Sequence, residues 1–147
     1  MAPLITLLAG SALARIAGLL GVDYTDSWPR AIAVGLAAMF LVTGIAHFAP
    51  PLRDQLVAIV PPALPAPGLL VSVTGVLELL GAVGLLLPAT RVAAAVCLLL
   101  LMLVMFPANV YAARMPDPPE SMTTRLPLRT VEEAVFLAAA ALVALTG

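Results

Sequence analysis

Glu78 is the residue of this sequence whose position most suggests chemistry. It is the single charged residue in the apolar segment 68–87 and lies near its middle. If this segment crosses a bilayer, a carboxylate at that depth costs at least about 2.5–3.5 kcal/mol unless it is paired, protonated or facing water. We therefore expect Glu78 to face the protein interior. Thr74 and Gly81 share its helix face and predict a small polar stripe that a neighbouring helix can approach closely.

Arg15 is a candidate partner for this carboxylate. It lies about twelve residues into the apolar segment 3–20, and Glu78 lies about ten residues into its own segment. At 1.5 Å per residue the two side chains reach similar depths if both helices begin on the same side of a membrane. One hypothesis is a buried Arg15–Glu78 ion pair. The other is that Glu78 is protonated and hydrogen-bonded, because a buried acid can neutralise instead of pairing.

A second polar group is predicted where three apolar segments begin or end. It forms a candidate interfacial pocket of Thr43, His47, Asn109, Tyr111 and Glu133. His47 is the only histidine, and an imidazole that titrates near neutral pH suits proton transfer or a polar ligand head group. The alternative is an interfacial histidine bonded to a backbone carbonyl. Asn109 follows Pro107, so its amide either satisfies the carbonyl that the proline frees or points into the pocket.

Several chemistries are not indicated. A net charge of −1 without a basic tract gives no footprint for nucleic acid. One histidine and scattered carboxylates lack the spacing of a metal site, and no haem, flavin or nucleotide motif is present. Cys97 is the single cysteine, so there is no disulfide framework and no C-x-x-C pair.

The elements that must position these residues are long apolar helices. The chain is 63% hydrophobic and 10% charged with a mean hydropathy of +1.13, whereas soluble domains have roughly 45–50% apolar and about 25% charged residues. Apolar stretches of about twenty residues without period-two alternation favour membrane-spanning helices over a barrel. Five such segments occupy residues 3–20, 31–49, 68–87, 92–113 and 130–145. We predict one all-α membrane domain over residues 1–147.

The connections add detail to this prediction. Residues 50–67 are rich in proline and predict a short amphipathic surface helix beginning at Leu52. The short turn at 88–91 predicts an antiparallel helical hairpin. Thr130 and Glu133 form a capping-box pattern, which predicts that the last helix begins at Thr130. Segment 1–21 is interpreted as a retained helix because it lacks a basic leading region, with a secretory signal as the alternative.

The arginines predict an orientation. If all five segments cross the membrane, the arginines in the connections are divided unequally between its two sides. Four lie on one side, Arg53, Arg114, Arg125 and Arg129, and two lie on the other, Arg30 and Arg91. The positive-inside rule then places the connections 50–67 and 114–129 in the cytoplasm.

Residues 31–145 resemble the DoxX-like family of small bacterial membrane proteins. The resemblance rests on PPALP at 61–65, TGVLELLG at 74–81, FPAN at 106–109 and RLPLR at 125–129. Members often read RLPLQ in the last motif, so Arg129 replaces a glutamine here. The resemblance implies a four-helix transmembrane bundle in the inner membrane, to which residues 1–21 add an N-terminal hydrophobic helix.

Three functions are compatible with these features. The first is a non-catalytic membrane subunit, or an anchor or assembly factor, for a membrane or soluble partner enzyme. The second, implied by the resemblance, is a component of a quinone-linked oxidoreductase, with quinone as cofactor and His47 or Glu78 handling its protons. The third is a small proton-coupled transporter. The sequence leaves open whether the chain also pairs with a second copy of itself.

Overall fold

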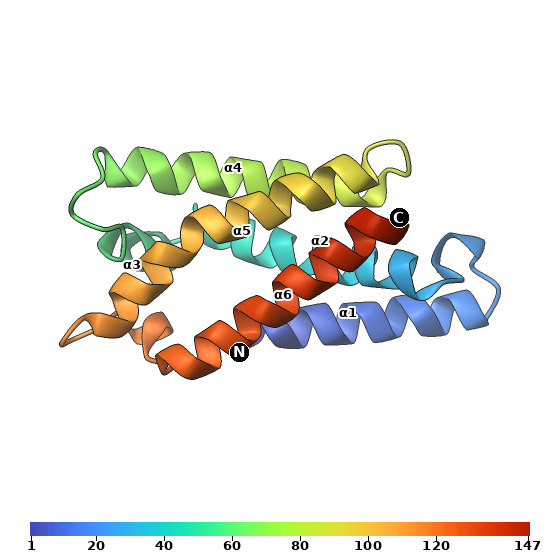
Figure 1. Cartoon of the computed structure of the whole chain (residues 1–147), viewed down its shortest axis with the longest axis horizontal. Coiled ribbons are helices and arrows are strands. Elements are labelled where there is room, and N and C mark those ends of the chain that lie inside the picture. The colour runs from blue at the N-terminus through green and yellow to red at the C-terminus, as the bar shows by residue number, and fades with distance from the viewer.

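The computed structural model describes all residues 1–147 and is entirely helical, as predicted (Figure 1). It has six α-helices: α1 Ala2–Leu19, α2 Trp28–Ala46, α3 Leu52–Ala58, α4 Pro67–Leu86, α5 Arg91–Arg114 and α6 Leu126–Thr146. Two 3₁₀ turns, Asp23–Thr25 and Glu120–Met122, lie in the connections. The short helix α3 begins at Leu52, the residue predicted for it.

Proline at the first or second position begins four of the helices, α1, α2, α4 and α6. Its missing N–H costs nothing there, and its ring presets the helical φ. In α6 this signal is Pro127, and it overrides the capping box predicted at Thr130. That prediction was wrong: the helix begins at Leu126, and the Thr130 hydroxyl donates to the Leu126 carbonyl inside the first turn.

The helices form an antiparallel bundle with α2 at its centre. α2 packs on α1, α4 and α6, while α5 packs on α4 and α6. The predicted hairpin of α4 and α5 is confirmed. Figure 1 shows α5 and α6 running in opposite directions and slanting across α4 and α1. The core includes Leu36, Phe40, Leu85, Leu98 and Val143, which come from four different helices.

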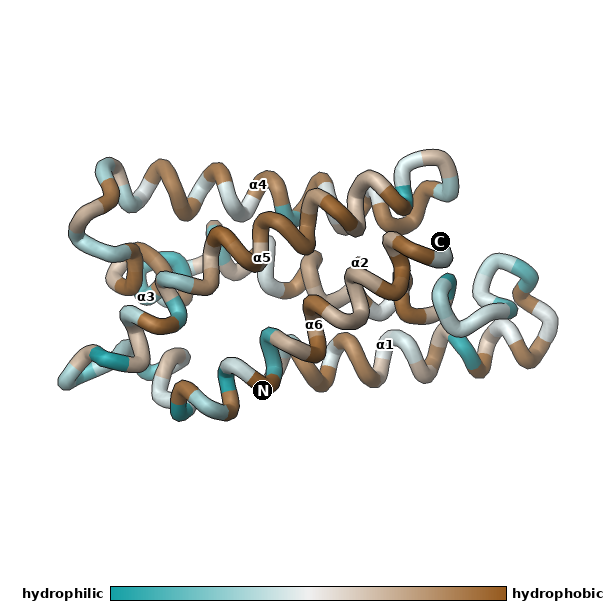
Figure 2. The backbone as a smooth tube through the Cα atoms, viewed as in Figure 1, coloured by the Kyte–Doolittle hydropathy of each residue, from teal (hydrophilic) through white to brown (hydrophobic).

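Four helices, α1, α2, α4 and α5, are long and apolar enough to cross a membrane. Figure 2 shows hydrophobic residues along these helices and hydrophilic residues gathered in the connections. α6 has a comparable length, but every eighteen-residue stretch of it includes Arg129, Glu132 and Glu133. Many large apolar side chains face outward, as a lipid-facing surface requires.

Candidate functional site

A cavity of about 240 Å³, open on one side, lies between α2, α4, α5, α6 and the loop that precedes α6. Its wall holds the side chains of Thr43, His47, Glu78, Asn109 and Glu133. The structure therefore joins Glu78 to the polar group that the sequence placed at the helix ends. Four of the five residues of the predicted interfacial pocket line this cavity.

Glu78 is held by α2. The Thr43 hydroxyl donates to Glu78 Oε2 at 2.5 Å, and His47 Nε2 lies 3.9 Å from Glu78 Oε1. Only 5% of Glu78 and 4% of His47 are exposed. Thr43 and His47 lie one turn apart on α2, which is why both face the same point of α4. The result is a buried carboxyl group that is hydrogen-bonded to the Thr43 hydroxyl and lies 3.9 Å from a buried imidazole.

Glycines allow this close approach of α2 and α4. A Cβ at Gly75 would lie 2.5 Å from His47 Cβ, and a Cβ at Gly44 would lie 2.9 Å from Leu79. The predicted stripe of Thr74, Glu78 and Gly81 does not meet a single neighbouring helix, because Gly75, which lies outside it, is the residue that admits His47 of α2. Gly81 instead faces Leu98 of α5.

His47 is oriented from two sides. Its Nδ1 lies 2.9 Å from the Thr43 carbonyl oxygen, which only accepts, so Nδ1 carries the proton. Arg53 donates to the His47 carbonyl at 2.8 Å and to Ser72 Oγ at 3.0 Å, which ties the end of α2 to α4.

The opposite wall comes from α5 and α6. Arg129 Nη1 donates to Asn109 Oδ1 at 3.1 Å, and Arg129 Nε donates to the Thr124 carbonyl at 2.8 Å. Asn109 therefore lines the cavity and bonds to Arg129, not to its own backbone. Glu132 Oε1 and Glu133 Oε1 are buried without a hydrogen-bond partner, although the Met1 amine lies 3.4 Å from Glu132.

The Arg15–Glu78 ion pair is not formed. The Arg15 guanidinium lies over the ring of Trp28, 5.9 Å from its centre, and Glu78 is bonded to Thr43. The physical reason is twofold. Arg15 lies against Trp28, the first residue of α2, whereas Glu78 lies against Thr43, fifteen residues further along, so the two side chains are about 22 Å apart along this helix. In addition, α1 packs on α2 and not on α4.

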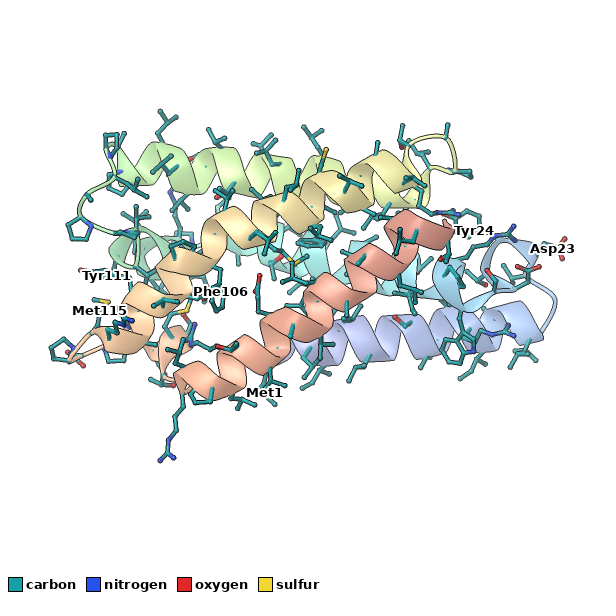
Figure 3. All side chains as sticks on the ribbon, in the orientation of Figure 1. Met1, Asp23, Tyr24, Phe106, Tyr111 and Met115 are labelled. Atoms are coloured by element: carbon teal, nitrogen blue, oxygen red, sulfur yellow. The ribbon has the colours of Figure 1, made fainter.

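Thr74 and Tyr111 make no hydrogen bond to Glu78. The Thr74 hydroxyl donates to the Leu70 carbonyl at 2.9 Å, in its own helix. Tyr111 is half-buried near the C-terminal end of α5 and lines neither cavity (Figure 3). Thr74 instead lines a second cavity of about 140 Å³.

This second cavity is almost wholly apolar and adjoins the first. It lies between α3, α4, α5 and the proline-rich connection. His47, Leu56 and Met105 line both cavities, so they stand between them.

The sequence reasoning overlooked two arginines that shape the site. Arg129 lines the cavity, and Arg53 holds the backbone of His47. Arg129 precedes Glu133 by one helical turn, a spacing that would have placed it on the same face once the start of α6 was known.

The fold and its cavity define a class: a multi-pass helical protein with membrane-spanning dimensions and buried ionisable groups that line a cavity. A family model described as a domain of unknown function (DUF8561) matches residues 36–144. Because the match covers more than half of the chain, the protein belongs to this family. The matched region includes all of the cavity-lining residues on α4, α5 and α6. No curated protein and no solved structure matches the chain.

Proposed function

We propose that this protein is a DoxX-like integral membrane protein that acts as a non-catalytic subunit and holds a small ligand for a partner enzyme. The observation that carries the proposal is the convergence of Glu78, Thr43 and His47 on one side of a 240 Å³ cavity. Buried ionisable groups inside a membrane protein are costly, and they mark binding sites or proton paths far more often than they serve packing.

The arrangement of the cavity supports binding of a ligand with a polar head. Glu78 and Glu133 come from helices far apart in the sequence, and each presents a carboxyl group to the same space. Phe40 and Phe136 line it as well, so a bound molecule would also meet apolar surface. The α3 helix and the loop before α6 lie beside the cavity and offer the surface on which a partner enzyme could dock.

The test is purification in mild detergent followed by mass spectrometry of co-purifying small molecules, lipids and proteins. We expect a bound molecule with the parent protein and its loss, by about tenfold or more, in Glu78→Gln, which keeps the shape but removes the acid. Glu120→Gln is the matched control, because Glu120 is exposed and lies outside the cavity.

Two results would contradict this proposal. One is that the parent protein co-purifies only with the same lipids that co-purify with Glu78→Gln. The other is equal loss in Glu78→Gln and Glu120→Gln. A thermal melt of each variant establishes that the comparison is made on folded protein.

A second candidate function is a component of a quinone-linked oxidoreductase. The apolar 140 Å³ cavity favours it, because an isoprenoid chain there would place its ring near His47 and Glu78. Electrons would then come from a partner. A quinone among the co-purifying molecules would support this function over the first.

The proposed topology has five spans, with α6 as the fifth, and cytoplasmic connections around α3 and before α6. In a Cys97→Ser background, we expect a membrane-impermeant maleimide to label Ala89→Cys in intact cells, while Asp54→Cys and Asp117→Cys stay protected until the cells are opened. All three positions are exposed in the structure. Labelling of Asp54→Cys from outside would reverse the orientation.

A further inference from the structure

The methionines of this chain are gathered in one place. Of six methionines, five line the main cavity: Met1, Met39, Met102, Met105 and Met122. Only Met115 lies elsewhere, near the end of α5 (Figure 3). Methionine often packs in irregular parts of a protein core. Packing alone does not require that nearly all methionines of the chain line the cavity that the only histidine also lines.

Two of these methionines, Met39 of α2 and Met102 of α5, belong to the same cluster of buried core residues. The helices that carry them begin at the same end of the bundle (Figure 1). Met105 follows Met102 by one turn, and it lines both cavities together with His47. Met122 differs, since its sulfur accepts from Arg129 Nη1 at 3.1 Å.

His47 has the arrangement of an imidazole ready to bind a metal ion. Its Nδ1–H is bonded to a backbone carbonyl, the outer partner that metal-binding histidines commonly have. Its other nitrogen, Nε2, lies 3.9 Å from Glu78 Oε1, which is beyond hydrogen-bond distance. His47 lines the cavity, and 5% of its side chain is exposed.

We infer that the cavity binds Cu(I), with the sulfur atoms of Met102 and Met105 and Nε2 of His47 as donors. Thioether and imidazole together suit a soft monovalent ion. The inference departs from the sequence expectation of no metal, which considered histidine, cysteine and carboxylate donors. No group of three or more of those side chains is arranged to hold a metal ion. The copper inference rests on the proposed function, because it names the class of ligand that the same cavity would bind.

The experiment uses the full chain in detergent with Ag(I), a redox-inert probe for Cu(I). All variants carry Cys97→Ser, because the exposed Cys97 thiol would itself bind Ag(I). We expect about one Ag(I) per chain by mass spectrometry of the desalted protein. Met102→Leu/Met105→Leu should weaken binding at least about tenfold. Leucine conserves the volume of methionine, so the fold should persist.

Met115→Leu is the matched control and should bind Ag(I) as the parent does. Equal binding by the double variant and this control would overturn the inference, as would a parent that binds no Ag(I). Glu78→Gln separates the two proposals. An organic molecule that co-purifies and is lost in Glu78→Gln, with no Ag(I) bound, would uphold the proposed function and overturn the copper assignment.

Discussion

Replacing Arg91 by methionine is expected to destabilise the protein by about 2–3 kcal/mol, because the guanidinium is the hydrogen-bond donor that closes the C-terminal end of α4. Arg91 is buried, with Nε donating to the Leu85 carbonyl at 3.1 Å and Nη2 to the Tyr24 hydroxyl at 3.0 Å. The Tyr24 hydroxyl in turn donates to the Leu86 carbonyl. A helix C-terminus favours a cation as well as donors, so both contributions are lost together.

The measurement is unfolding in detergent, by heat or by titration with a denaturing detergent. Tyr24→Phe removes only the hydroxyl and should cost about 1 kcal/mol. Arg30→Met is the control, since Arg30 is exposed and its ion pair with Asp26 is worth little. If Arg91→Met unfolds under the same conditions as Arg30→Met, the proposed role of Arg91 at this helix end is incorrect.

Gly35→Ala should loosen α1 from α2 and cost about 1–3 kcal/mol, as overpacking of a close helix contact does. A Cβ at Gly35 would lie 2.6 Å from the Leu7 carbonyl oxygen and 2.8 Å from the Ser11 amide nitrogen. These are backbone atoms of α1, so the helix itself must move. Gly68→Ala is the matched control, because a Cβ there meets only Arg53 Nη2 at 3.9 Å.

A local reporter can separate displacement of α1 from general unfolding. Trp28 is the only tryptophan, and the Arg15 guanidinium of α1 lies 5.9 Å from its ring centre. Movement of α1 in Gly35→Ala should change the emission of Trp28 below the melting temperature. In Gly68→Ala the emission should stay as in the parent. If emission and stability are unchanged in Gly35→Ala, the contact between α1 and α2 accommodates the added methyl group without a loss of stability, which would contradict this prediction.

The sequence by itself determined where the helices are and what solvent they suit. Apolar length and composition marked each long helix to within a few residues, because a chain with 63% hydrophobic residues has few polar positions at which to break. Apolar residues at helical spacing from Leu52, followed by prolines, predicted the short helix α3. The brief turn before Arg91 required α4 and α5 to lie antiparallel. Burial of Glu78 also followed from one residue and its surroundings, since an isolated carboxylate cannot face lipid.

The tertiary structure alone decided which helices are neighbours, and therefore which residues share a site. Helices that are apolar on all sides carry little directional pattern, so their contacts depend on the fit of small residues such as Gly35 and Gly75 against a partner far along the chain. This is why Glu78 meets Thr43 and His47 near the end of α2, whereas Arg15 lies against Trp28 at the start of that helix. The gathering of the methionines arises in the same way, because separate helices supply them to a single cavity.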